Sequence, residues 1–577
     1  MAAAKVIAEY GRKGAYIPMD KLREKLGGLK NLNKLLGKLT VIEKVHASRS
    51  FGAAPTVRHA YIRGDNLIIP RIKCAALLSA HLIDGIVQAA DALPLPRLID
   101  EEKCKEEEPL YEYQEAAVKH LCENYFSDDQ ILAFKSVAYL QMDTGLGKSR
   151  VGCGVIARRR EPALVVVPTE AIGNQWVDEF ADLYPKLNVA FYHNLPKGSR
   201  KIQPSPLSHD VIIIIVNTFR DKPPEFLEGF GTIVIDEAHE YHSARNLQAL
   251  WLSQTRAVLG LSATPTGRPD GLDIYVNLHL GPVIYPKDIP GFDICSVNFR
   301  GTVRVINYIG HPDYCESVIT PTGTMSAIMT IGSIIMDPYR TALIANEVKR
   351  IYRLHETSSP EELIKLGLGP RPQSAATATH PAGEIRRHGI FIFAEHRDYL
   401  PIIGDAISKV LSDAEILVPE ISLLRGGVTK NTVDAARQRG AHIVLTTYGF
   451  SRRGISLPDM TCIIEATPRR NGMHQILGRI LRRGSDESIV RQIIDIVDTR
   501  TGLKSQITDR RKVYKEKNYE LLKPIKISWD AIGGDNGDNG GGGDNGDNGD
   551  NGDNGDNGDN GDTEEQIDEL FSLISDH

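Results

Sequence analysis

The stretch Gln141-Met-Asp-Thr-Gly-Leu-Gly-Lys-Ser149 follows an apolar run and precedes a segment, residues 150–158, that is predicted to be helical. A strand, a tight loop containing glycine and a Gly-Lys-Ser sequence opening a helix are typical of a phosphate-binding loop. Lys148 would reach the β- and γ-phosphates, and the Ser149 hydroxyl would ligate Mg²⁺. Met142 stands where the pattern usually has its first glycine. On this stretch alone, a glycine-rich turn before a helix is therefore the competing interpretation.

Residues 110 to about 300 alternate predicted strands and helices, which favours a parallel α/β sheet. Four predicted strands in this range end in polar residues. These ends are Pro168-Thr169 after 164–167, Asn217-Thr218 after 211–216, Asp236-Glu237 after 232–235, and Ser262 after 259–261. Because ligands bind at the carboxyl ends of strands in such sheets, the four ends predict a single site.

The pair Asp236-Glu237 directly follows a strand made of apolar and β-branched residues. Asp236 would hold Mg²⁺, and Glu237 would orient and deprotonate an attacking water. The alternative is a helix N-cap, a position that acidic side chains also favour. The phosphate-loop pattern earlier in the same sheet favours the catalytic interpretation.

A second α/β pattern begins at residue 390, with strands predicted at 390–393, 416–418, 442–445 and 462–464 and an end near Asp498. It contains no phosphate-loop pattern. Gln475, Arg479 and Arg482 are spaced to share one helical face, where two arginines could clamp a phosphate. Surface arginines on a helix are the alternative. Residues 300–335 are ambiguous, an amphipathic helix is predicted at 337–352, and 355–384 is predicted to be an insertion or mobile loop.

Residues 1–108 contain no catalytic motif. A helical segment at residues 21–39 is predicted to be interrupted at Gly27-Gly28, and alternating apolar residues at 57–71 predict a β-hairpin. At the other end, the Gly-Asp-Asn repeats of 533–562 lack apolar residues and predict disorder. Residues 563–577 predict a short amphipathic helix that either docks on a protein partner or folds back onto its own body.

The composition is that of an ordinary globular protein, with 41% hydrophobic and 25% charged residues. The seven cysteines are scattered and form no Cys-x-x-Cys, which predicts a reducing, intracellular compartment. No apolar run is long enough to span a membrane. Residues 533–577 hold 14 acidic and no basic residues, so residues 1–532 carry a net charge of +8 although the whole chain carries −6. A mildly basic body permits a nucleic-acid partner without requiring one.

Taken in order, six motifs resemble those of the superfamily 2 helicases. They are TGLGKS (144–149), PTEAIGNQW (168–176), DEAH (236–239), SATPTGR (262–268), the segment ending in Gly454, and QILGRILR (475–482). Within that superfamily, QxxGRxxR and SATPTGR look more like the group acting on double-stranded DNA than like DEAD-box RNA helicases. The layout is similar to that of the poxvirus transcript-release DNA helicases and their relatives in other large DNA viruses, with an IIPR hairpin (68–71) and DPYR (337–340).

The resemblance implies an α/β fold of two tandem RecA-like parallel-sheet domains that bind ATP and Mg²⁺ between them. The implied nucleotide-binding residues are Gln114, Thr144, Gly145, Leu146, Gly147, Lys148, Ser149 and Gly454. The implied catalytic residues are Lys148, Asp236, Glu237, Gln475, Arg479 and Arg482, with Ser149 and Asp236 at the metal. Ser262 and Thr264 would couple hydrolysis to nucleic-acid contact, and Pro168, Thr169, Thr218 and Thr447 would contact the nucleic-acid backbone.

These features divide the chain into seven parts: an N-terminal accessory region (1–108) that could contact nucleic acid, a RecA-like ATP-binding domain (109–300), a connector or insertion (301–389), a second RecA-like domain (390–505), an extension (506–532), the disordered acidic repeat (533–562) and a short amphipathic helix (563–577). The predicted function is an ATP-driven motor on nucleic acid, with DNA favoured over RNA. The alternatives are an RNA helicase and a nucleotide-gated clamp that recruits partners without unwinding.

Overall fold

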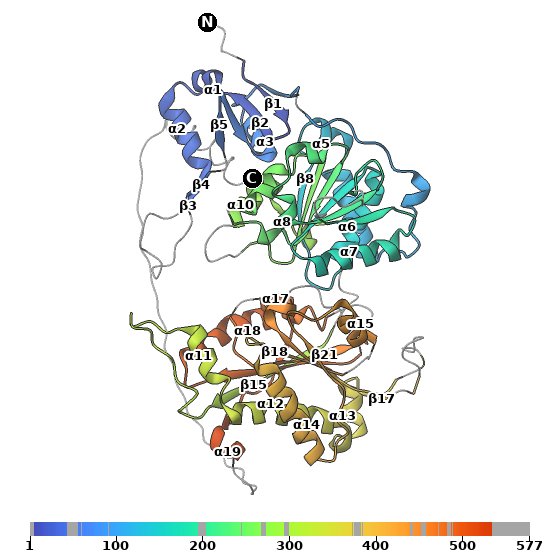
Figure 1. Ribbon diagram of the computed structural model, residues 1–577, viewed down its shortest axis with the longest axis vertical. Helices are drawn as coiled ribbons and strands as arrows, with labels where there is room; N and C mark the ends of the chain where they lie inside the picture. Colours follow the sequence, from blue (N-terminus) through green and yellow to red (C-terminus); the bar gives the residue numbers. More distant parts are fainter. Residues whose placement is uncertain are drawn as a thin grey trace. The chain divides into compact units, whose positions relative to one another are not determined.

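The computed structural model describes most of the chain up to Gly533. The described residues are 5–42, 56–58, 60–90, 92–193, 203–243, 245–266, 273–293, 299–371, 373, 382–383, 385–438, 442–451, 457, 459–470, 472–481, 486 and 488–533. The repeat at 534–562 and the helix predicted at 563–577 lie outside this set. The described chain forms two compact units, which divide near residue 294 (Figure 1).

The first unit begins with a small five-stranded sheet that has its own apolar core. Its order is β5 (Tyr61–Arg63), β6 (Asn66–Ile69), β2 (Gly14–Pro18), β1 (Ile7–Gly11) and β7 (Gly85–Gln88). The predicted hairpin is present as antiparallel β5 and β6. The predicted helical segment is interrupted where the sequence indicated, between α1 (Met19–Lys25) and α2 (Leu29–Lys38), because Gly27 and Gly28 adopt positive φ angles.

The larger sheet of the first unit is parallel throughout. Its order is β10 (Val189–Tyr192), β11 (Val211–Ile215), β9 (Ala163–Val167), β12 (Thr232–Ile235), β13 (Ala257–Ser262), β8 (Val137–Gln141) and β14 (Val283–Ile284). The predicted strands 164–167, 211–216 and 232–235 are β9, β11 and β12, and almost all of their residues are buried. Both faces are covered, as parallel sheets require.

The helices of the first unit lie on opposite sides of this sheet. Side chains of α8 (Val216–Phe219), α9 (Leu247–Leu252) and α10 (Asp273–Leu280) share one core cluster with alternate strand residues. On the other face, α6 (Lys148–Arg159) packs between α4 (Glu112–Asn124) and α7 (Glu170–Leu183). Gly152 allows the close approach of α7, since a Cβ there would lie 2.4 Å from the Trp176 ring.

The second unit is built on an eight-stranded parallel sheet. Its order is β19 (Ile421–Leu424), β20 (Ile443–Thr447), β18 (Gly389–Ala394), β21 (Met460–Glu465), β22 (Arg491–Asp498), β15 (Gly301–Ile309) and β23 (Glu520–Leu521), with β24 (Ile525–Ser528) also on β15. One face is covered by α11 (Ala327–Ile334), α12 (Pro338–Thr357) and α14 (Tyr399–Asp413). The other is covered by α15 (Lys430–Gln438), α16 (Tyr448–Ser451), α17 (Met473–Leu477) and α18 (Ile507–Glu516).

Three sequence predictions for the second unit differ from the structure. β15 and α12, assigned to a connector, are integral to the sheet domain, and β23 and β24 of the extension complete it. The strand predicted at 416–418 is instead β19, a few residues later, and Leu417 is exposed. The segment predicted to be a loop at 355–384 contains α13 (Pro360–Lys365), which begins with a capping box at Ser359.

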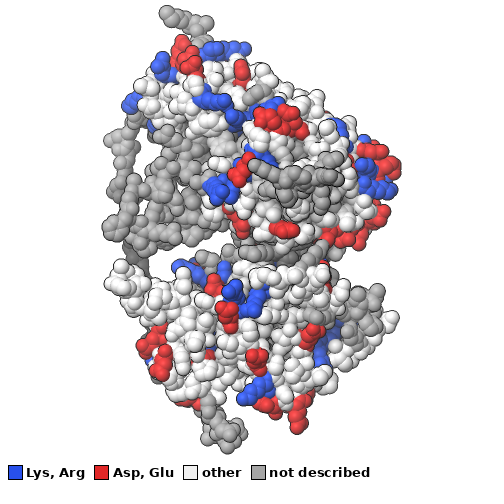
Figure 2. Space-filling view, viewed as in Figure 1, with Lys and Arg blue, Asp and Glu red and all other residues white. Residues whose placement is uncertain are grey.

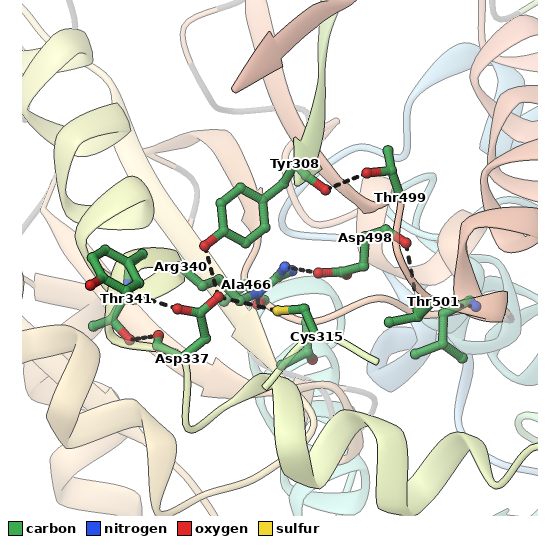
Figure 3. Close-up of polar contacts among 12 residues, drawn as sticks. Tyr308, Cys315, Asp337, Arg340, Thr341, Ala466, Asp498, Thr499 and Thr501 are labelled. Carbon is green, nitrogen blue, oxygen red and sulfur yellow. Dashed lines mark hydrogen bonds and ion pairs between the residues drawn. The ribbon is translucent and has the colours of Figure 1, made fainter. Parts of the chain in front are cut away.

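A buried polar cluster joins α12 to the sheet of the second unit (Figure 3). Arg340 is fully buried, forms an ion pair with Asp498 at the end of β22, and donates from Nε to the carbonyl oxygen of Ala466 at 2.9 Å. Beside it, the Tyr308 hydroxyl donates to Oδ2 of Asp337 at 2.7 Å. Asp337 also accepts from the backbone N–H of Tyr339 at 2.9 Å and so caps α12.

A second buried cluster joins α18 to β21 and β22. Arg510 donates to Asp495 at 2.7 and 2.9 Å and lies 3.4 Å from Glu465, and the Tyr514 hydroxyl lies 2.8 Å from both carboxylates. One guanidinium thus faces two buried carboxylates. Burial, followed by the charge of Asp495, raises the pKa of Glu465 to about 8. The raised pKa favours the protonated form of Glu465 beside the ion pair of Arg510 and Asp495.

The first prediction concerns this proton. In the unfolded chain the Glu465 carboxyl loses its proton at about pH 4.3. In the folded chain the carboxyl keeps this proton to a much higher pH. The folded state binds more protons in this window, so stability falls as pH rises through it. We expect the unfolding free energy of the wild type to fall relative to that of Glu465→Gln between about pH 5 and 8. Urea denaturation at stepped pH measures it, with exposed Glu520→Gln as control. Parallel curves for wild type and Glu465→Gln would contradict the assignment.

The second prediction concerns Arg340. Replacing it with alanine leaves the Asp498 carboxylate buried without its ion-pair partner, which typically costs about 3–5 kcal/mol. Urea denaturation of the Arg340→Ala variant should show a loss of that size. Arg353→Ala, on an exposed position of the same helix, should change stability by less than about 1 kcal/mol. Equal losses in the two variants would show that the buried pair is not what stabilises this helix.

Candidate active site

Parallel pairing in the first unit places five strand ends at one edge of the sheet, in the order β11, β9, β12, β13 and β8. The four polar segments identified in the sequence lie at the ends of β11, β9, β12 and β13, and the glycine-containing loop follows β8. The backbone confirms that β8 and β13 end together, since the N–H of Met142 donates to the carbonyl oxygen of Ser262 at 3.0 Å. The loop, the Asp236-Glu237 pair and Ser262 are thus brought to one place.

The loop between β8 and α6 has the backbone that its glycines allow. Gly145 and Gly147 adopt φ angles of 95° and 78°, and Lys148 is the first residue of α6. The N–H groups at the start of α6 and the half-buried Ser149 lie at this edge. Met142, the departure from the usual loop pattern, is fully buried. Its side chain is part of the core, so the departure leaves the glycines and Lys148 in place.

Gln114, the predicted adenine-reading residue, is buried on α4 next to this loop. Its Oε1 accepts from the backbone N–H of Tyr111 at 3.1 Å, which fixes the start of the helix. A Cβ on Gly147 would lie 2.3 Å from its Nε2. Gly147 is therefore required twice, by its positive φ and by the close approach of Gln114.

Asp236 is almost completely buried at the end of β12. Its Oδ2 accepts from the indole N–H of Trp176 at 2.8 Å, and its Oδ1 accepts from the backbone N–H of Glu237 at 2.9 Å. Burial and then the Glu237 charge raise the pKa of Asp236 to about 6, whereas the bond from Trp176 and the charge of Lys148 act in the opposite direction. The structure thus brings Lys148 and Asp236 close enough to interact electrostatically.

Glu237 has a strained backbone, with φ at 47° in the left-handed region that favours glycine. This conformation turns the chain sharply after Asp236. Oε2 of Glu237 is buried and lies 3.3 Å from Nδ1 of His239, and within the described residues it has no hydrogen-bond partner. A carboxylate oxygen held in this way can accept a proton from a bound water.

A chain of contacts leads from Glu237 to the segment after β13. Nδ1 of His239 lies 3.0 Å from Oγ of Ser262, and that oxygen accepts from the backbone N–H of Thr264 at 3.0 Å. The two predicted coupling residues are therefore joined to the acidic pair through His239. His239 belongs to the DEAH motif, which is the signal in the sequence that could have pointed to this role.

Trp176 is a second residue of this site that was not predicted from the sequence. It is fully buried on α7, and its indole N–H bond to Asp236 orients that carboxylate. The only signal in the sequence was its place in the motif at 168–176. No local pattern indicates that a tryptophan donates to a carboxylate 60 residues away.

The predicted nucleic-acid contacts lie at strand ends or just beyond them. Thr169 caps α7 by accepting from the N–H of Ile172 at 3.4 Å, and Pro168 precedes it. Thr218 lies on α8 after β11, and in the second unit Thr447 ends β20 and accepts from the N–H of Phe450 at 3.2 Å. Their contact with nucleic acid stays a prediction.

The predicted helical face of Gln475, Arg479 and Arg482 is not formed in the described residues. The helix α17 ends at Leu477, and Arg479 lies in the following turn, whose N–H groups bond three residues back. The interruption falls at Gly478. Gln475 lies on α17 with its Oε1 buried and without a hydrogen-bond partner in the part of the chain that is described. Arg482 and Gly454 lie outside the described residues.

Comparison with known proteins identifies the family. The family described as "Type III restriction enzyme, res subunit" matches residues 107–267, the range that holds this site. A protein of African swine fever virus, printed as "Putative ATP-dependent RNA helicase", is 39% identical over 515 residues, 88% of this chain and 91% of its own length. The chain belongs to the superfamily 2 helicases. It is an ATP-dependent helicase, and the fold is the tandem RecA-like α/β arrangement that the motifs indicated.

Two further similarities are weaker. The "ATP-dependent DNA helicase uvsW" of Enterobacteria phage T4 is 20% identical over 398 residues, 66% of this chain and 69% of that protein. The solved structure of Mss116p bound to ssRNA and AMP-PNP has a TM-score of 0.44 at 13% identity, covering 72% of this chain and 77% of that one. Among the described residues, no helix of the helicase is long and apolar enough to cross a membrane.

The third prediction tests Trp176. Trp176→Phe keeps most of the buried ring but removes the N–H that orients Asp236, and loss of such a supporting bond typically costs 10- to 100-fold in activity or metal affinity. We expect ATP turnover to fall by about tenfold and the Mg²⁺ concentration needed for half-maximal turnover to rise. Steady-state ATPase assays over a Mg²⁺ series measure both. Trp251→Phe, on α9, is the matched control and should leave both values near wild type. Wild-type turnover in a correctly folded Trp176→Phe would contradict the positioning role.

Proposed function

We propose that this helicase hydrolyses ATP at the edge formed by residues 144–149, Asp236 and Glu237, and uses the energy to move along duplex DNA. The proposal rests on the environment of the Glu237 carboxylate. Its Oε2 is buried beside His239 and, within the described chain, accepts no hydrogen bond, so it is available to take a proton from water. Its position one residue after Asp236 suits a base acting next to a metal-bound phosphate.

The residues at the loop fit ATP with Mg²⁺. The N–H groups at the start of α6 and the Lys148 ammonium offer positive charge to phosphate oxygens. Mg²⁺ prefers oxygen ligands and is usually held by one or two carboxylates together with substrate phosphates. The Ser149 hydroxyl and the Asp236 carboxylate offer such oxygens, and each Asp236 oxygen accepts only one hydrogen bond in the described structure. Bound Mg²⁺ would neutralise charge on the phosphates.

His239 and Ser262 are proposed to link hydrolysis to movement. When Glu237 gains a proton or shifts, its contact with Nδ1 of His239, at 3.3 Å, changes. The same Nδ1 of His239 contacts Oγ of Ser262, and that oxygen accepts a hydrogen bond from the backbone N–H of Thr264. A change at His239 would therefore be passed on to Thr264. Gln114 would recognise adenine. Gln475, Arg479, Arg482 and Gly454 stay predictions for the contribution of the second unit.

Duplex DNA is proposed as the track, from the motif pattern of the sequence. Pro168, Thr169, Thr218 and Thr447 would contact its backbone at strand ends. On the face shown in Figure 2, basic and acidic residues are interspersed in small groups over both units, so the choice of substrate rests on the motifs. RNA is the second candidate, because the African swine fever virus relative carries the name of an RNA helicase.

The fourth prediction tests the chemistry. Lys148→Ala removes the phosphate-binding ammonium, and Glu237→Gln removes the base, so each should lower ATP turnover at least about a hundredfold. Glu237→Gln should still bind ATP, as measured by equilibrium binding of a fluorescent analogue. Glu240→Gln, which changes an exposed acid three residues away, should keep turnover near wild type. Full turnover in Glu237→Gln would refute the assignment of the base.

The fifth prediction tests the substrate. ATPase activity should be stimulated more strongly by duplex DNA than by single-stranded DNA or RNA of equal length. Strand displacement or translocation should be measured on the same substrates, with Glu237→Gln as the inactive control. Greater stimulation by RNA would favour the second candidate, and stimulation without any displacement or translocation would favour a nucleotide-gated clamp.

A further inference from the structure

The positive charge of the helicase is concentrated in its N-terminal region. Residues 1–90 contain 15 basic and six acidic residues, a net charge of +9, whereas residues 1–532 together carry +8. Residues 91–532 therefore carry −1, although they hold both large parallel sheets. A basic charge gathered in one region in this way indicates that the region attracts a polyanion.

Some of these basic residues attach the small sheet to the larger sheet of the first unit. Arg71, the first residue of α3 (Arg71–Ser79), is buried. Its guanidinium donates to the Tyr10 hydroxyl at 2.9 Å and to Oγ of Ser136 at 3.2 Å. It also donates to the carbonyl oxygens of Thr255 and Arg256. Because Ser136 and Arg256 directly precede β8 and β13, buried hydrogen bonds join the small sheet to the strands that end at the candidate active site.

Helix α2, which lies beside α1, presents a basic side to solvent (Figure 1). Its Leu32 and Leu35 are buried in the core of the small sheet, and the helix contains no acidic residue. The opposite side of the helix follows the i, i+3, i+4, i+7 spacing of a single stripe. We define the α2 surface as this stripe, whose four residues are all exposed: Lys30, Asn33, Lys34 and Gly37.

Gly37 is a glycine that the described fold does not require. It lies inside α2 without a positive φ angle, and a Cβ added to it would meet no atom of the described chain within 4 Å. Glycine destabilises the interior of a helix relative to alanine, and it is used where another molecule approaches the backbone closely. Its place one turn after Lys34 suits the close approach of a phosphate group.

The α2 surface matches the backbone of a nucleic acid in charge and in length. From Lys30 to Gly37 the helix rises roughly 10 Å, a length over which duplex DNA carries about six negative charges. Lysine and asparagine side chains commonly donate to phosphate oxygens. Since the chain belongs to a helicase family, nucleic acid is the polyanion that it has to bind.

We infer that the α2 surface binds the sugar–phosphate backbone of the nucleic acid on which the helicase acts. Lys30 and Lys34 contact phosphates, Asn33 donates a hydrogen bond, and Gly37 lets the backbone approach. The contact does not depend on base sequence, and Arg71 connects it to the sheet that carries the candidate active site. The inference rests on membership of the helicase family and not on the assignment of the catalytic base.

The double variant Lys30→Gln, Lys34→Gln of the full chain tests the charge, because glutamine keeps the helix propensity of lysine. Binding of a labelled DNA duplex, without nucleotide, is measured by fluorescence anisotropy over a salt series. The slope of log Kd against log salt concentration should fall by about 2, and affinity in about 0.1 M salt should fall at least about tenfold. Lys365→Gln, Lys409→Gln, at exposed positions of α13 and α14, is the matched control and should keep both values near wild type.

Gly37→Ala tests the close approach and separates it from a structural role. The methyl group should raise the Tm, because alanine is the better helix former, and should raise the Kd for the duplex, because it holds the phosphate away. Gly332→Ala, on α11, is the control, since a Cβ there would also meet no atom of the described chain within 4 Å. It should raise the Tm and leave the Kd unchanged. An unchanged Kd in Gly37→Ala would contradict the close approach.

Wild-type affinity and salt slope in Lys30→Gln, Lys34→Gln would overturn the inference, and so would equal losses in the control pair. Tighter binding in the double variant would show that an acidic protein segment occupies the surface, and would overturn it as well. Glu237→Gln should bind the duplex as the wild type does, so an error in the proposed ATP site leaves this test intact. The same loss is expected with an RNA duplex, because the contact is to phosphates.

Discussion

Parallel strand pairing is the constraint on which both units depend. Parallel sheets occur almost only with both faces buried, so each sheet here is covered by helices on both sides and its central strands are rich in Val, Ile and Leu. Parallel pairing also sends every strand in the same direction, so the carboxyl ends gather at a single edge. In the first unit that edge receives the phosphate-type loop after β8, Thr169 after β9, Thr218 after β11, two carboxylates after β12 and Ser262 at the end of β13. The site is therefore a consequence of the sheet rather than of any one motif.

The features that the sequence predicted well are those with local causes. The runs at 163–167 and 211–215 are apolar and mostly β-branched, which favours buried strands, and the consecutive glycines 27 and 28 weaken a helix because they lose the most conformational freedom in it. The loop at 144–149 and the pair Asp236-Glu237 directly follow the strands β8 and β12, as the sequence predicted, whereas their roles at an ATP site stay predictions. The structure explains why the loop tolerates Met142 at this position. Its side chain belongs to the core, and its backbone N–H donates to the carbonyl oxygen of Ser262.

The features that the sequence did not predict depend on partners far away in the chain. β15 was assigned to a connector because nothing nearby pairs with it, and its partner β22 begins at Arg491. The bond from Trp176 to Asp236, and the path from Glu237 through His239 to Ser262, likewise join different strands and helices. The end of α17 at Leu477, before Arg479, was not predicted for another reason. The spacing of charged residues at 475–482 fits a helix, but Gly478 weakens it, and the backbone changes to a turn there.

The position of β15 has a consequence for folding during synthesis on the ribosome. β15 is the first strand of its sheet to be made, but it pairs along one edge with β22 and along the other with β23 and then β24, which are among the last. At typical synthesis rates the roughly 180 residues between β15 and β22 take about 10–40 s to emerge. During that time β15 has neither neighbour, and it alternates apolar residues that favour aggregation. The second unit can therefore close its sheet only after almost its whole length has been translated, whereas the first unit can complete its own sheet while the second is still being made.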